Sequence, residues 1–90
     1  MERVLVEIYC EADVVEFCSQ RCEQYRLPPF SSWCDVVPEY SESSPHLRVG
    51  YTLRLKGTPP SKIDVDKVVT DLRRKDGAGR VFVVRPIGFR

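Results

Sequence analysis

The strongest signal in the sequence is the alternation of apolar and polar side chains between His46 and Lys56. Successive side chains of a β-strand point to opposite faces, so this pattern predicts a strand with one face buried and the other in solvent. The buried face would carry Leu47, Val49, Tyr51, Leu53 and Leu55, and the solvent face His46, Arg48, Thr52, Arg54 and Lys56. A strand of this kind requires a second layer of structure against its apolar face.

Two helical segments supply such a layer. The first begins near Asp13, and its apolar positions recur at helical spacing until Pro28 disfavours a helical backbone in the residue before it. The second is expected to begin at an Asp64 cap and to end before Gly77. Its inward stripe consists of Val65, Val68, Val69 and Leu72.

Three further strands are predicted by β-branched and aromatic side chains at residues 3–10, 31–37 and 81–84. Pro38 and Pro86 stand near the ends of the last two, and proline cannot donate a ladder hydrogen bond, so we expect both strands at sheet edges. The order of the elements predicts a ferredoxin-like split β-α-β sandwich (βαββαβ), with two helices on one face of a four-stranded antiparallel sheet. Residues 1–90 would form it as a single α+β domain.

The composition excludes several classes of protein. Apolar residues make up 42% and charged residues 30%, a balance typical of a folded domain and foreign to disordered and membrane chains. With 14 basic and 13 acidic side chains, the net charge of +1 produces no global attraction to nucleic acid or to an anionic membrane. The apolar runs fall far short of the roughly 20 residues of a spanning helix, and no secretory signal follows Met1. We therefore expect a cytoplasmic protein that does not bind membranes.

The four cysteines Cys10, Cys18, Cys22 and Cys34 lie in the first half of the chain. They fall on helix and strand faces that are expected to point inward, which favours buried free thiols. The alternatives are a disulfide from Cys34 to Cys10 or Cys22, and a thiol-redox or zinc site with or without His46. Zinc sites usually carry short Cys-x-x-Cys turns, which this sequence lacks, so we expect no metal and no other cofactor.

No catalytic constellation is visible in the sequence. His46 is the single histidine, and no serine and aspartate stand in a recognisable relation to it. Acylphosphatases share the predicted topology and hold phosphate in the loop after the first strand. Here that loop is Glu11-Ala12-Asp13, whose acidic side chains would repel an anion. We therefore expect that the chain is not an enzyme.

The uncovered face of the predicted sheet is the strongest candidate for a functional surface. Counted at period two, apolar side chains of several strands can point away from the helices, and the segment after Pro86 adds two more. The expected protein-binding set is Tyr9, Trp33, Phe82, Val84, Ile87 and Phe89. This set predicts a non-catalytic protein-binding module, either a free-standing inhibitor of the immunity or anti-defence type or a small subunit of a complex. Its partner would be another protein or a second copy of the chain.

A nucleic-acid-binding module is the alternative interpretation. RNA-recognition modules share the predicted topology and stack bases on aromatic side chains of the open sheet face. The corresponding set here is Tyr9, Arg48, Arg54 and Lys56. The strand around Tyr51 lacks the paired outward aromatic residues of those modules, because Tyr51 itself is expected to point inward. We therefore rank protein binding first.

Overall fold

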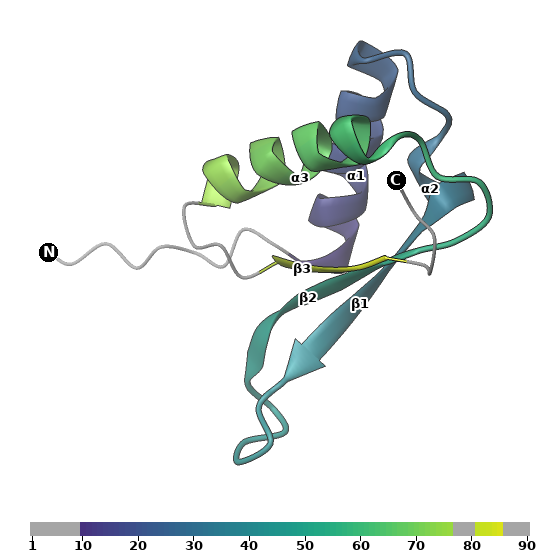
Figure 1. The fold of residues 1–90 in the computed structure, drawn as a ribbon. Coiled ribbons are helices and arrows are strands. Elements are labelled where there is room, and N and C mark those ends of the chain that lie inside the picture. Colours follow the sequence, from purple (N-terminus) through teal and green to yellow (C-terminus); the bar gives the residue numbers. More distant parts are fainter. Residues whose placement is uncertain (1–9, 77–80, 86–90) are drawn as a thin grey trace, which may run out of the picture.

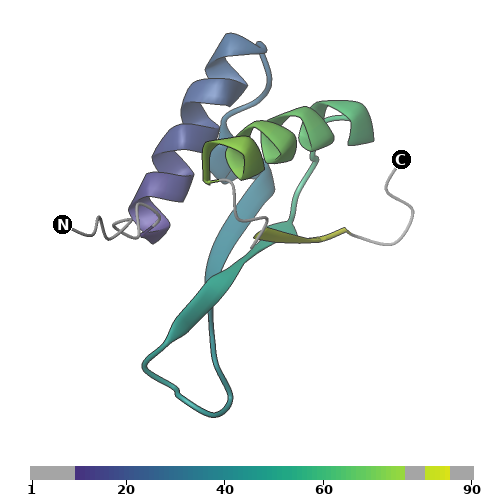
Figure 2. The ribbon, with the colours of Figure 1, turned by 90° about the vertical axis from the view of Figure 1, so that its left-hand side faces the viewer.

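The computed structural model describes residues 10–76 and 81–85 (Figure 1). The elements in chain order are α1 (Glu11–Gln24), α2 (Phe30–Trp33), β1 (Cys34–Tyr40), β2 (Arg48–Leu55), α3 (Lys62–Asp76) and β3 (Val81–Val84). The strands form one sheet in the order β1-β2-β3, in which β1 is antiparallel and β3 is parallel to β2. Helices α1 and α3 lie on one side of this sheet (Figures 1 and 2). The predicted α+β class is confirmed.

The predicted four-stranded antiparallel ferredoxin-like sheet is wrong. In that arrangement the strand expected at residues 3–10 lies between β2 and β3. In the structure β2 and β3 are direct neighbours, with Tyr51 opposite Val81. Helix α3 connects these two strands, and such a crossover joins strands that run in the same direction, which makes the sheet mixed. Residues 3–9 lie outside the described residues, and Cys10 is the extended N-cap residue of α1.

The sequence predicts a strand that begins at residue 31, and this start is wrong. Residues 31–33 belong to helix α2. The φ angle of Pro29, −53°, suits the start of a helix, and its carbonyl accepts a hydrogen bond from the N–H of Ser32 at 2.9 Å. Phe30 and Trp33 therefore lie three residues apart on one helical turn, and their ring centroids are 5.1 Å apart in an edge-to-face contact. Both rings are buried, and the indole N–H of Trp33 donates to the carbonyl oxygen of Pro28 at 3.0 Å.

The core lies between the helices and the inner face of the sheet. Helix α3 buries Val65, Val68, Val69 and Leu72, which confirms the predicted stripe. The other core residues are Val14, Cys18, Cys22, Phe30, Trp33, Cys34, Val36, Tyr51, Leu53 and Val81. Within residues 10–76, no helix combines the length and the apolar character that crossing a bilayer requires.

The alternation of residues 46–56 matches the structure only where the helices cover the strand. Tyr51 and Leu53 are buried and Arg54 is exposed, as predicted. Leu47 and Val49 are exposed, so their predicted burial is wrong. Thr52 is buried, so its predicted exposure to solvent is also wrong. The β1–β2 hairpin extends beyond the helices (Figure 1), and a register shift near the end of β1 interrupts the ladder there.

Hydrogen bonds fix the ends of the two long helices. Ser61, not Asp64, caps α3, because its hydroxyl oxygen accepts the backbone N–H of Asp64 at 3.3 Å. Helix α1 ends in a Schellman motif, in which the N–H of Leu27 donates to the carbonyl oxygen of Cys22 at 2.8 Å. Arg26 holds the left-handed position of this motif, with a φ of 57°, a conformation that glycine adopts with less strain.

Replacing Leu53 by alanine is expected to lower the free energy of unfolding by about 2 to 5 kcal/mol, because it opens a cavity where β2 meets the helices. Arg54→Ala, one residue further along and exposed, is expected to change it by no more than about 0.5 kcal/mol. Urea unfolding followed by circular dichroism measures both values. Comparable losses for the two variants would show that the register of β2 is wrong.

Arg26→Gly is expected to raise the free energy of unfolding by up to about 1 kcal/mol, because it removes a side chain from a left-handed backbone position. Gln24→Gly, two residues earlier and inside the helix, is the matched control and is expected to lower it by about 1 kcal/mol. Thermal unfolding of both variants tests the pair. If Arg26→Gly also destabilised the protein, the contacts of the arginine side chain would outweigh the backbone strain.

Candidate functional site

The candidate site is the side of the sheet opposite the helices, called the outer face below. Thr52 and Arg54 alternate along β2 with the buried Leu53, so they and their ladder partners point away from the core. These partners are Val37 and Asp35 on β1, and Phe82 and Val84 on β3. The outer face therefore combines apolar and charged side chains from all three strands of the described sheet.

Phe82 and Val84 form an apolar strip along β3. Each of these residues is 53% exposed. Thr52, beside them on β2, is only 8% exposed, and its hydroxyl donates to Oε2 of Glu39 at 2.9 Å. Because this hydroxyl has a partner, the strip continues across β2 to Val37 without an unsatisfied polar group between the strands.

Charged side chains of both signs border this strip. Lys56 follows β2, and its Nζ lies 2.8 Å from Oδ1 of Asp35. On the acidic side, Glu39 of β1 accepts the hydrogen bond from Thr52. Exposed ion pairs contribute little to stability, so these residues matter mainly as a polar border. An apolar centre with a polar border is the usual anatomy of a protein-binding surface.

Strand β3 ends the sheet in the described part of the chain, so one of its edges has no neighbouring strand there. Its four residues, Val81-Phe-Val-Val84, are all β-branched or aromatic and therefore favour strand pairing. Arg73 of α3 donates to the carbonyl oxygen of Val81 and so ties the start of the strand to the helix. A free edge of this kind can accept an extended segment of another protein through main-chain hydrogen bonds.

The structure brings together only part of the expected protein-binding set. Phe82 and Val84 are exposed on the same face of β3. Trp33 is 1% exposed and lies in the core, because residues 30–33 are helical, so its assignment to the surface is wrong. Tyr9, Ile87 and Phe89 lie outside the described residues.

The cations of the nucleic-acid-binding set do not gather on one face. Arg48 lies over the ring of the buried Tyr51, with 5.1 Å between its Cζ atom and the ring centroid. Arg54 lies on the outer face, and the charge of Lys56 is paired with that of Asp35. A phosphate backbone on the outer face would therefore meet a carboxylate beside its cations.

Three of the four cysteines lie in the core. Cys18, Cys22 and Cys34 are buried, Cys10 is exposed, and all four are free thiols. Burial raises the pKa of Cys22 to about 11 and that of Cys34 to about 12, and it raises the pKa of Cys18 as well. At neutral pH these three groups are protonated and therefore unreactive. Across the described ranges, no three His, Cys, Asp or Glu side chains are placed to hold a metal ion.

Glu39 contributes to the outer face although the predicted strand did not include it. The predicted strand stopped at Val37, because proline usually ends a strand, whereas β1 continues through Pro38 to Tyr40. Within the described sheet β1 is an end strand, the position in which proline is tolerated. The period-two continuation Asp35, Val37, Glu39 was the available signal.

A comparison of the chain with protein-family models, with curated proteins and with solved structures finds no match. The function therefore has to be argued from the surface of the molecule.

In the native protein, a thiol reagent such as Ellman's reagent is expected to modify the thiol of Cys10 rapidly and the other three only after denaturation, because burial keeps them protonated and inaccessible. Cys10→Ser is expected to abolish the rapid phase. Absorbance at the reagent's product wavelength measures both phases. Rapid reaction of a second thiol, or fewer than four reactive thiols after denaturation, would contradict the assignment of three buried free thiols.

Proposed function

We propose that the chain is a non-catalytic protein-binding module that binds its partner through the outer face and through the edge of β3 that has no neighbouring strand among the described residues. It acts as a free-standing inhibitor, of the immunity or anti-defence type, or as a small subunit of a larger complex. A cytoplasmic location is part of the proposal, because a reducing compartment keeps the cysteines as thiols.

The observation that carries this proposal is the exposure of Phe82 and Val84 beside each other on β3. The helices cover the opposite side of the sheet (Figure 2), so they do not shield these two side chains. Burying a large apolar side chain of this kind contributes about 1.5 to 3 kcal/mol. The pair is therefore suited to the centre of an interface, with the ion pair of Lys56 and Asp35 at its border.

We assign an extended segment of a different protein as the occupant of this surface. Such a segment would add a strand beside β3, and its alternate side chains would contact Phe82 and Val84. The neighbouring Arg54 and the backbone groups of this edge would fix its position and direction. The proposal that the module is not an enzyme continues to rest on the sequence, whose single histidine, His46, is exposed in the hairpin loop.

Phe82→Asp is expected to weaken capture of the physiological partner at least about tenfold, because it places a charge at the centre of the interface. Ile63→Asp is the matched control: Ile63 is 72% exposed on α3, away from the outer face, and its replacement is expected to leave capture unchanged. Affinity capture from the native host, with and without nuclease, followed by titration of the purified partner, measures both.

Equal affinities of the parent and of Phe82→Asp for the partner would overturn the proposed interface. Loss of capture on nuclease treatment would favour nucleic acid as the partner. Light scattering of the parent chain, of Phe82→Asp and of a chain ending at Arg85 distinguishes a third outcome. If only the parent is a dimer, the occupant of this surface is a second copy of the chain.

A further inference from the structure

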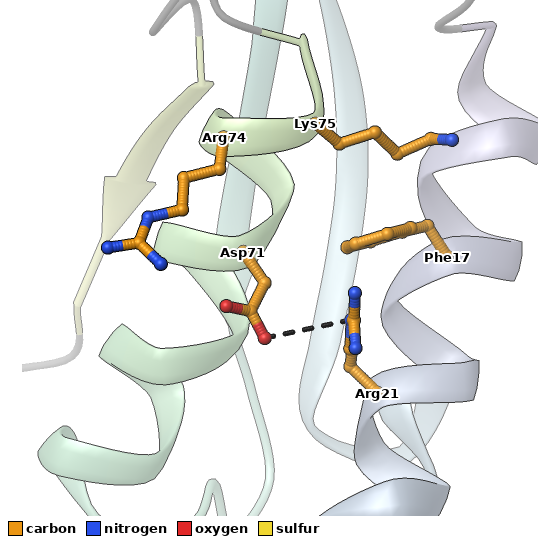
Figure 3. A pocket seen from close by; sticks show the side chains of 5 residues that line it. All are labelled: Phe17, Arg21, Asp71, Arg74 and Lys75. Atoms are coloured by element: carbon orange, nitrogen blue, oxygen red, sulfur yellow. Dashed lines mark ion pairs between the residues drawn. The ribbon is translucent and has the colours of Figure 1, made fainter.

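A second surface feature lies on the helical side of the domain, away from the outer face. An open groove of about 470 Å³ lies between helices α1 and α3 (Figure 3). Its lining residues are Phe17, Arg21, Asp71, Arg74 and Lys75. Three of these five side chains are cationic, although the whole chain is close to neutral.

An aromatic ring positions two of the cations. The guanidinium carbon of Arg21 lies 4.9 Å from the centroid of the Phe17 ring, and Nζ of Lys75 lies 5.5 Å from the same centroid. Figure 3 shows the Phe17 ring between these two side chains. Cation–π contacts of this kind hold the charged groups near the groove before a ligand arrives. Binding therefore costs little side-chain entropy, because these groups are already ordered. They also occupy the ring, so it is not available for stacking on a nucleobase.

Asp71 is the one carboxylate of the lining, and its charge is already engaged. Its Oδ2 atom accepts a hydrogen bond from the hydroxyl of Tyr25 and lies 3.6 Å from Nε of Arg21. In the described part of the chain, neither Arg74 nor Lys75 forms an ion pair. Three cations against one carboxylate leave the lining with two positive charges.

Two further charged groups interact with residues at or beside the lining. Lys67 lies over the ring of Tyr25, with Nζ 5.3 Å from the centroid, and adds a positive charge on one side. Asp13 adds a negative charge on the other, where its pKa is lowered mainly by the backbone N–H of Cys10 and to a smaller extent by Lys75. These two opposite charges offset each other.

We propose that this groove is a binding site for a phosphate monoester. Such a group carries about 1.5 to 2 negative charges at neutral pH, which matches the excess positive charge of the lining, whereas a carboxylate or a nucleic-acid phosphodiester carries one. The fork of donors on Arg21 suits phosphate oxygens. Figure 3 shows the Arg74 side chain on the other side of Asp71 from Arg21, so Arg74 contributes its positive charge to the lining and not a second fork at the same point. The volume falls in the range of small-ligand sites and leaves room for the group that carries the phosphate. The site does not depend on the proposed protein-binding function.

Asp71 has a defined part in this site. It competes with the ligand for Arg21. Together with Gln24, whose Oε1 accepts a hydrogen bond from Nη1 of Arg21 at 2.7 Å, it holds that side chain at the groove when the ligand is absent. Asp71→Asn removes the competing charge but retains an oxygen that accepts the hydrogen bond from Tyr25. This variant is therefore expected to bind the phosphate monoester more tightly than the parent.

The test is a titration of the ¹⁵N-labelled full chain with O-phosphoserine and with glycerol 3-phosphate, at constant ionic strength, followed by amide chemical shifts. Saturable shifts are expected around Phe17, Arg21 and Asp71. The double variant Arg74→Gln, Lys75→Gln is expected to bind about tenfold more weakly, and Asp71→Asn about threefold more tightly. Arg54→Gln on the outer face removes a comparable exposed charge and is expected to bind like the parent.

The two probes and a diester control separate the outcomes. Tighter binding of O-phosphoserine supports a phosphorylated side chain as the source of the phosphate, and tighter binding of glycerol 3-phosphate supports a small metabolite. Dimethyl phosphate, which carries one charge, is expected to bind at least about threefold more weakly than either. The proposal is overturned if neither monoester gives saturable shifts, if the diester binds equally well, or if the double variant retains the affinity of the parent.

Discussion

The burial of the inner face of β2 is the constraint on which the rest of the structure depends. β2 is the middle strand of the described sheet, and its Tyr51 and Leu53 pack beneath the helices while their ladder partners lie on both sides. Strand β3 has only four residues, too few to be stable alone, and it is held by β2 on one edge and by Arg73 of α3 at its start. Where the helices end, the inner face of the hairpin becomes exposed.

The sequence predicted the elements whose pattern is local. The two long helices and the central part of β2 follow from periodicity, because each buries a face that the spacing of its apolar residues defines. β3 follows from its β-branched and aromatic composition. Strand pairing is non-local, and no pattern within residues 81–84 indicates that they pair directly with β2. Helix α2 was missed because Trp33 suits a strand face as well as a helical turn, and only its packing against Phe30 decides between them.

The two candidate surfaces also differ in how much of each can be predicted from local sequence. Period two places Phe82 and Val84 on one face of their strand, whereas the packing of Val81 beneath the helices decides that this face is the exposed one. The groove between α1 and α3 depends on how two helices approach each other, which brings Phe17 within reach of Lys75, 58 positions later in the chain. An apolar surface and a cationic groove thus lie on opposite sides of one small domain, where each can be altered without touching the other.

The hairpin that extends beyond the helices divides β1 and β2 into two parts of different local stability. Around Leu53 the backbone hydrogen bonds are covered by the core, so their amides open to solvent only when the whole domain unfolds. Around Arg48, with the exposed Leu47 and Val49 beside it and a register shift in the ladder, the strands can separate while the core stays intact. Amide hydrogen exchange would therefore slow steeply along β2, from the tip of the hairpin toward the helices, within a single pair of strands.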